Sequence, residues 1–198
     1  LWCDWSSDVC SSDLERANGR TDFIGILNRH GRMHPDIADF PGRMFYGSER
    51  LAPVPLPHQK ETALGYATDR ADDDTDRLLK GHRMVFIPSP ACKRQDISDK
   101  VNIAEAVIVA DVLRRIHGYY GRKFDAAKTV GVIVPYRNQI ATIRREIEKC
   151  GIEELEKISI DTVERYQGSQ RDVIIYSLTV QNRYQLEFLT DNCFVENG

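Results

Sequence analysis

Residues 129–134 read TVGVIV, an unbroken apolar run that Pro135 ends. Such a run is typical of a strand buried on both faces of a parallel sheet. Isoleucines at helical spacing follow in residues 138–149, and two more strand-like runs lie at 158–163 and 172–178. Strands that alternate with a helix indicate right-handed crossovers and a sheet between helical layers. We therefore predict an α/β fold with a mainly parallel sheet.

The segments on the amino-terminal side of this core give shorter patterns. An apolar run at 23–27 predicts a strand. Pro35 suits the first turn of a helix that follows, with Ile37 and Phe40 facing inward. Residues 47–82 are rich in proline and then acidic, and we interpret them as a long surface excursion.

A longer helix is expected between a short apolar strand at 84–88 and the core strands. Asn102, with Glu105 three residues later, resembles a capping box, in which the two side chains bond to each other's backbone. The helix is expected to end near His117. Its apolar face is expected to consist of Ile103, Val107, Ala110, Leu113 and Ile116.

Composition excludes several classes of protein. The 198 residues include 27 Lys and Arg against 30 Asp and Glu, and this near balance excludes a polycationic coat for nucleic acid. No apolar run reaches the roughly 18 residues of a spanning helix, so we expect no membrane association. The five scattered cysteines fit neither a disulfide framework nor a zinc site. A reducing, cytoplasmic (intracellular) location is expected.

Residues 1–14, LWCDWSSDVCSSDL, differ from the rest of the chain. They hold both tryptophans and no lysine or arginine, so they lack the basic start of a signal peptide. They also lack a helical or strand period. We interpret them as a non-native or disordered leader and assign residues 15–198 to the folded domain.

Three polar loops are expected where ligands bind in open α/β sheets, beyond the carboxyl ends of the strands. They cover residues 28–35, 135–139 and 164–172; all are polar and contain arginine, and the second and third also contain glutamine. The chain has no GxxxxGK[ST] phosphate loop and no GxSxG, HExxH or GxGxxG motif. We therefore expect the domain to complete a site held by another domain, and we expect it to hold no metal itself.

Three segments together resemble a known family. They are GRMHPDIADFPGRMFY (31–46), VGVIVPYRNQ (130–139) and ISIDTVERYQGSQRDVIIYSLT (158–179). In this order they are similar to motifs in the second RecA-like domain of superfamily 1 helicases of the up-frameshift/senataxin-like branch. The resemblance covers roughly residues 21–195. It implies a RecA-like three-layer α/β/α domain of a P-loop NTPase, cut before the last helicase motif and inactive alone.

The resemblance implies a role in an ATP-dependent helicase or translocase. ATP and Mg²⁺ would be held mainly by the first RecA-like domain of the same polypeptide, and the substrate would be single-stranded DNA or RNA. Arg32 matches the family arginine that reaches the γ-phosphate. The residues that match nucleotide-binding positions are Gln167, Gly168 and Gln170, and those that match nucleic-acid-binding positions are Pro135, Tyr136, Gln139, Thr162 and Val163.

Two departures and several alternatives qualify this interpretation. Gly31 stands where relatives often have a tyrosine that stacks on the base, and Gln170 stands where an acid is common. Arg32 could be a surface arginine at a helix start, Gln139 a capping residue and Thr162 an ordinary strand residue. The whole chain could be a non-catalytic nucleic-acid- or protein-binding RecA-like module, or an unrelated α/β nucleotide-binding domain.

Overall fold

The computed structural model describes residues 18–19, 28–46, 51–66, 71–90, 100–166, 170–182 and 184–185. Its contacts divide the chain into two compact units. The smaller unit comprises residues 1–64 with 82–84, and the larger comprises residues 65–81 with 85–198.

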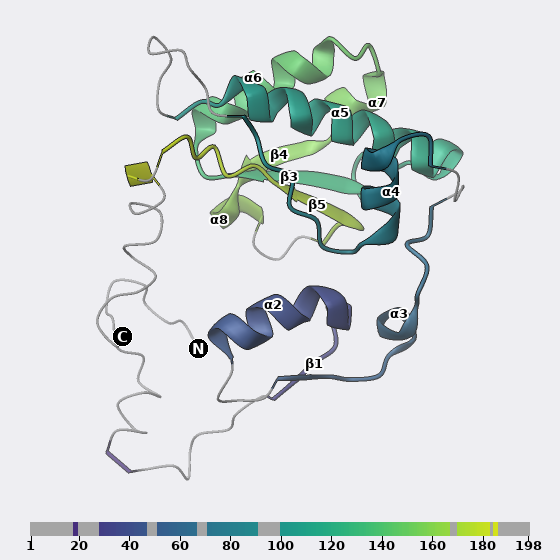
Figure 1. Cartoon of the computed structure of the whole chain (residues 1–198), viewed down its shortest axis with the longest axis vertical. Coiled ribbons are helices and arrows are strands. Elements are labelled where there is room, and N and C mark those ends of the chain that lie inside the picture. The colour runs from purple at the N-terminus through teal and green to yellow at the C-terminus, as the bar shows by residue number, and fades with distance from the viewer. Residues whose placement is uncertain are drawn as a thin grey trace. The chain divides into compact units, whose positions relative to one another are not determined.

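The larger unit is built on a three-stranded parallel sheet with the strand order β4–β3–β5 (Figure 1). The strands are β3 (Val130–Val134), β4 (Ser159–Thr162) and β5 (Val173–Tyr176). In register, Val134 of β3 pairs with Thr162, and Ile133 pairs with Tyr176. The three carboxyl ends therefore lie at one edge of the sheet. The predicted α/β fold with a parallel sheet is confirmed.

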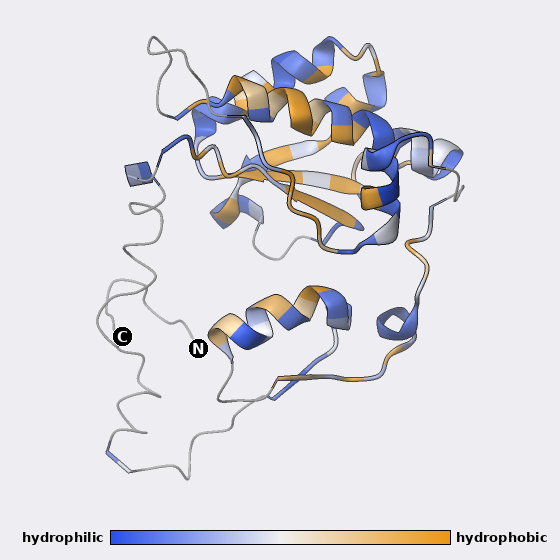
Figure 2. Cartoon of the chain, in the orientation of Figure 1, coloured by the Kyte–Doolittle hydropathy of each residue, from blue (hydrophilic) through white to orange (hydrophobic). Residues whose placement is uncertain are grey.

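Helices cover the two faces of this sheet unequally. Figure 1 shows α5 (Ile103–Tyr120) and α6 (Arg137–Glu148) on one face and the short α8 (Val163–Tyr166) on the other. Two further short elements are α7 (Glu153–Glu156) and the 3-10 turn Gly121–Lys123. Figure 2 shows the apolar strands beneath α5 and α6. The fully buried side chains of this layer include Leu113, Ile143, Ile147, Val130, Val132 and Val134.

A cluster of ion pairs joins α4 (Asp74–Gly81) and the residue before it to α5 within the larger unit. Arg115 lies 2.7 Å from Asp76 Oδ1 and 2.7 Å from Asp111 Oδ2, and it also pairs with Asp73. The hydroxyl of Tyr119 donates to Asp76, which is only 6% exposed. These bonds, together with a backbone N–H from Asp72, lower the pKa of Asp76 to about 2.

The smaller unit contains β1 (Arg29–His30), α2 (Pro35–Phe45), β2 (Ala52–Pro53) and α3 (Pro57–Lys60). β1 and β2 pair in parallel. Pro35 occupies the first turn of α2, as predicted, because the missing proline N–H has no helical partner there. The predicted inward face is wrong, since Phe40 is 51% exposed and Ile37 is also exposed. Ala38 is the buried residue of α2.

The strand predicted at 23–27 and the leader predicted at 1–14 lie outside the described residues. The prediction of a strand at 84–88 is wrong. None of the described strands pairs with this segment, and Phe86 is 76% exposed. None of the described helices has the length and apolar character needed to cross a membrane.

Helix α5 differs in detail from its prediction. It continues beyond His117 to Tyr120, and Gly121 ends it with a positive φ of 51°. A glycine tolerates this left-handed conformation, which is why the chain can leave the helix there. Val107 was expected to face inward but is 49% exposed. Ala110, Leu113 and Ile116 are buried as predicted, and Ala106, Val109 and Val112 are buried beside them.

Candidate functional site

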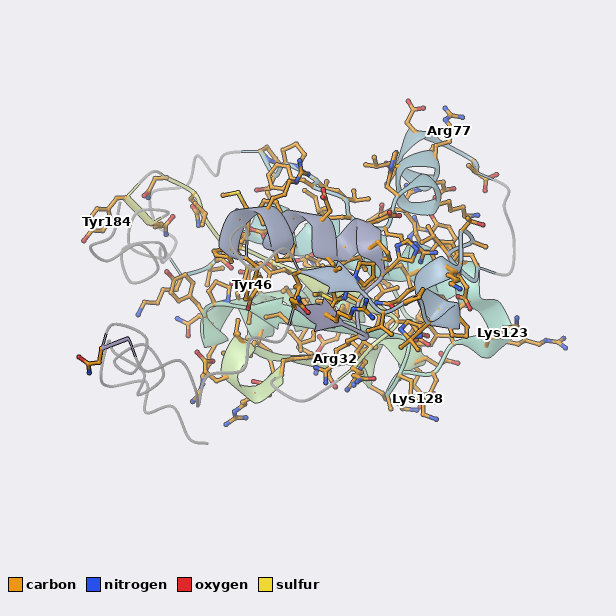
Figure 3. All side chains as sticks on the ribbon, turned by 90° about the horizontal axis from the view of Figure 1, so that it is seen from below. Arg32, Tyr46, Arg77, Lys123, Lys128 and Tyr184 are labelled. Carbon is orange, nitrogen blue, oxygen red and sulfur yellow. The ribbon has the colours of Figure 1, made fainter. Side chains whose placement is uncertain are left out.

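Arg32 lies on the loop between β1 and α2, in the smaller unit (Figure 3). Its side chain is exposed, and no described residue forms an ion pair with its guanidinium. A guanidinium stays charged at all physiological pH values and presents a planar set of N–H donors. Among the described residues, no carboxylate competes with an anion that approaches this guanidinium.

His34 shapes the turn that follows Arg32. Its Nδ1 accepts the backbone N–H of Asp36 at 3.2 Å and so caps α2. Because Nδ1 accepts, the ring proton lies on Nε2, which donates to the carbonyl of Glu61 at 3.1 Å. Arg83 donates to the same carbonyl at 2.5 Å. His34 thus joins the start of α2 to the segment after α3, which is a structural role.

The register of the larger sheet brings together four of the residues predicted to bind nucleic acid. Val134 pairs with Thr162, so the half-buried Pro135 and Tyr136 follow β3 beside the point where Thr162 ends β4. Val163, the first residue of α8, is half exposed beside them. These four residues share the carboxyl-terminal edge of the sheet.

The donors of Thr162 have partners within the protein. Its N–H donates to Asp161 Oδ1 at 2.9 Å, and its hydroxyl donates to the Glu164 carboxylate. That hydroxyl bond is the main reason that the pKa of Glu164 is lowered, and the charge of Arg137 lowers it further. Glu164 is exposed, so its side chain can turn away. A phosphate must displace Glu164 to reach the hydroxyl.

Gln139 is fully buried, so its side chain does not reach the surface of this edge. Its Oε1 accepts the N–H of Asn102 at 2.9 Å, and its Nε2 donates to the Asn102 carbonyl at 2.9 Å. The Nε2 also lies 3.5 Å from the hydroxyl of Ser177, just after β5. This geometry favours an indirect role for Gln139, in which it holds the loop after β3 rather than contacting a ligand.

Sequence reasoning missed the role of a half-buried carboxylate, that of Glu105, at the same edge. Glu105 was expected to complete a capping box. Asn102 does cap α5, with Oδ1 accepting the Glu105 N–H at 3.1 Å. The Glu105 carboxylate instead accepts the N–H of Thr179 at 2.9 Å, and it also takes bonds from Ser177 and Leu178. Burial raises the pKa of Glu105 against the opposing effect of these bonds.

Thr179 has a positive φ of 62° and is fully buried. A β-branched residue in this conformation is strained by about 1–3 kcal/mol, and such residues concentrate at functional sites. The bond to Glu105 holds the strained turn in place. The sequence offered one signal for this polar turn, the residues Ser177 to Thr179 at the end of the strand predicted at 172–178.

The third polar loop does not stay at one edge, contrary to expectation. It leaves β4 at the carboxyl-terminal edge and must enter the parallel strand β5 at the opposite edge. Arg171 Nη2 accordingly donates to the hydroxyl of Ser159 at 3.1 Å, at the start of β4. The exposed Gln170 therefore lies toward the amino-terminal edge, away from Thr162. Gln167 and Gly168 lie outside the described residues.

The parallel sheet with helices on its faces is the arrangement of an α/β domain. The sequence matches the family described as AAA domain over residues 10–194, and the chain belongs to that family. It is a superfamily 1 helicase-like domain with a RecA-like fold.

Several proteins named as helicases are similar to it. The chain is 27% identical over 185 residues to the DNA polymerase alpha-associated DNA helicase A of Saccharomyces cerevisiae, which covers 87% of this chain and 25% of that protein. It is 26% identical over 170 residues to the helicase sen1 of Schizosaccharomyces pombe, covering 84% and 9%. It is 24% identical over 154 residues to the probable helicase senataxin of Homo sapiens, covering 78% and 5%. The chain thus spans a quarter or less of these relatives.

Proposed function

We propose that this domain works within an ATP-dependent helicase or translocase, where Arg32 completes an ATP site held by another RecA-like domain of the same polypeptide. The observation that carries the proposal is the exposed guanidinium of Arg32 on a loop whose backbone is bonded to its surroundings. The names of the similar proteins support the same activity.

The proposed chemistry requires little of this domain beyond a well-placed charge. Negative charge spreads over the oxygens of the γ-phosphoryl group as it is transferred to water, with Mg²⁺ and the first domain holding the nucleotide. Arg32 would donate two N–H groups to those oxygens. The bonds strengthen as charge accumulates, so they would speed hydrolysis more than they tighten ATP binding. Gln167, Gly168 and Gln170 match nucleotide-binding positions of the family, and we propose that they contact the nucleotide.

The carboxyl-terminal edge of the larger sheet is proposed as part of the floor on which single-stranded DNA or RNA binds. Pro135, Tyr136, Thr162 and Val163 combine an aromatic ring, a hydroxyl and exposed apolar surface at adjacent strand ends. Bases can stack on such a ring, and a hydroxyl can donate to a phosphate once Glu164 turns away. The buried Gln139 holds the backbone behind this edge through its two bonds to Asn102.

The test uses the polypeptide that carries this domain together with the ATP-holding domain. Arg32→Ala is expected to lower the kcat of ATP hydrolysis about 10³-fold or more while the Kd for ATP stays within about twofold. Arg43→Ala is the matched control, since it removes an exposed arginine paired with Asp39 on the neighbouring helix and is expected to change neither value.

A near-normal kcat in the Arg32→Ala protein would remove Arg32 from catalysis. If single strands still bind while the unsubstituted protein hydrolyses no ATP, the domain would be a non-catalytic binding module instead.

A further inference from the structure

Gln59 belongs to a segment without a recognisable motif, and it bonds to the backbone on both sides of Arg32. Its Nε2 donates to the carbonyl of His30 at 3.1 Å and to that of Met33 at 2.8 Å. These carbonyls lie on either side of Gly31 and Arg32 in the chain. Gln59 is only 4% exposed, and its Oε1 accepts the N–H of Leu56 at 3.4 Å.

This arrangement uses a property particular to a primary amide. The two hydrogens of Nε2 are fixed in one plane, so a single nitrogen can tie two carbonyls together. The carbonyl of His30 also accepts the N–H of Val54, which secures it a second time. The turn that carries Arg32 is therefore closed across its base by one buried side chain.

A second contact of the same segment restrains the middle of the loop. His58 Nε2 donates to the carbonyl of Gly31 at 2.8 Å. A Cβ added at Gly31 would lie 3.2 Å from Leu56 Cδ1, so residues 56–59 run close over the loop. Three successive parts of the loop backbone are thus bonded to one short segment, while the Arg32 side chain itself stays exposed.

We infer that Gln59 is a positioning residue for Arg32, an inference that rests on the proposed function. With both carbonyls fixed, the direction in which Arg32 leaves the backbone is set before ATP arrives. Fixing a catalytic group in advance lowers the entropy lost in the transition state, and a displacement of about 1 Å costs on the order of 10²-fold in rate. Loss of the Gln59 donors is therefore expected to lower kcat and to leave ATP binding unchanged.

The experiment is a double-mutant cycle in the polypeptide that contains both RecA-like domains. Gln59→Met keeps the size of the side chain and removes both donors, and it is expected to lower kcat about 10- to 100-fold with an unchanged Kd for ATP. In the Arg32→Ala background, the same substitution is expected to have no further effect on kcat. Lys60→Ala, at an exposed neighbour, is the matched control and is expected to be neutral.

The outcomes separate the inference from the function on which it rests. If Gln59→Met lowers kcat by the same factor in both backgrounds, it acts on the fold in general and the inference is overturned. If Arg32→Ala lowers kcat but Gln59→Met does not, the inference alone fails. If Arg32→Ala has no effect, the proposed function fails.

Folding is checked by thermal unfolding of each variant. Gln59→Asn retains the amide on a side chain one methylene shorter, and it decides the question if Gln59→Met does not fold. It is expected to lower kcat in the unsubstituted protein and to have no further effect in the Arg32→Ala background. An equal loss in both backgrounds again overturns the inference.

Discussion

The amide of Gln139 meets both backbone groups of Asn102, each at 2.9 Å, in the way that a neighbouring strand would. Asn102 caps α5, and Gln139 lies in the first turn of α6. One side chain therefore fixes two helix starts relative to each other. Both helices begin at the edge where Pro135 and Thr162 lie, so the pair holds the backbone of the proposed nucleic-acid floor.

Gln139→Leu is expected to destabilise the protein by about 1–3 kcal/mol, because it leaves the buried N–H of Asn102 unpaired, whereas the Asn102 carbonyl keeps the N–H of Ala106 at 3.1 Å. Urea unfolding followed by circular dichroism measures the loss. Gln170→Leu, at an exposed glutamine, is the control and is expected to change the free energy of unfolding by less than about 0.5 kcal/mol. A loss below about 1 kcal/mol for Gln139→Leu would contradict the assigned bonds.

Acid is expected to weaken the contact between α4 and α5 through Asp76. Its pKa lies near 2 in the folded protein, mainly because Tyr119 donates to it, and rises to an ordinary value near 3.8 on unfolding. The folded state therefore binds the proton less readily. The stabilisation that Asp76 provides is complete above pH 3.8 and is lost as the pH falls toward 2.

Asp76→Asn is expected to cost about 1.5–3 kcal/mol at pH 7, the contribution of hydrogen bonds to a charged group. It is also expected to flatten the pH dependence of the free energy of unfolding between about pH 4 and pH 2. Urea titrations at several pH values measure both effects. Asp74→Asn, at an exposed carboxylate of the same helix, should leave the slope unchanged. An unchanged slope in Asp76→Asn would show that other carboxylates cause the acid response.

The sequence predicted those parts of the fold that depend on local pattern. β3 was evident because a strand buried on both faces needs apolar residues in succession, and Asn102 was evident because its cap bonds only three residues ahead. The strand expected at 84–88 failed because an apolar run says nothing about a partner strand.

The candidate site was predicted less completely, because its supports are distant in sequence. Glu105 bonds to a backbone group 74 residues away, so the local capping pattern was misleading. Gln59 bonds to carbonyls 26 and 29 residues away and belongs to no recognisable motif. Residue types at loop ends indicated where chemistry could occur, whereas the buried amides and the half-buried carboxylate that hold those loops required the structure.

Tyr166 packs against the backbone of β3 at Gly131. Its hydroxyl donates to the carbonyl of Ser159 at 3.0 Å, and the ring is buried against the sheet. A Cβ on Gly131 would lie 1.9 Å from that hydroxyl oxygen and 2.7 Å from Cζ. Real atoms do not approach so closely, so any side chain at residue 131 must displace the ring. Tyr166 ends α8, so this contact holds the first residues of the third polar loop (164–172) against the sheet.

Gly131→Ala is expected to destabilise the protein by about 1–3 kcal/mol, the usual cost of overpacking a core. In the Tyr166→Leu background the clashing atoms are absent, and Gly131→Ala is expected to be neutral or stabilising by up to about 1 kcal/mol, since alanine loses less entropy in a strand. Urea unfolding of the four proteins gives the coupling. Gly118→Ala, at an α5 glycine with open space around it, should stabilise by about 0.5–1 kcal/mol in either background. Equal losses from Gly131→Ala with and without the tyrosine ring would mean that Tyr166 does not occupy this space.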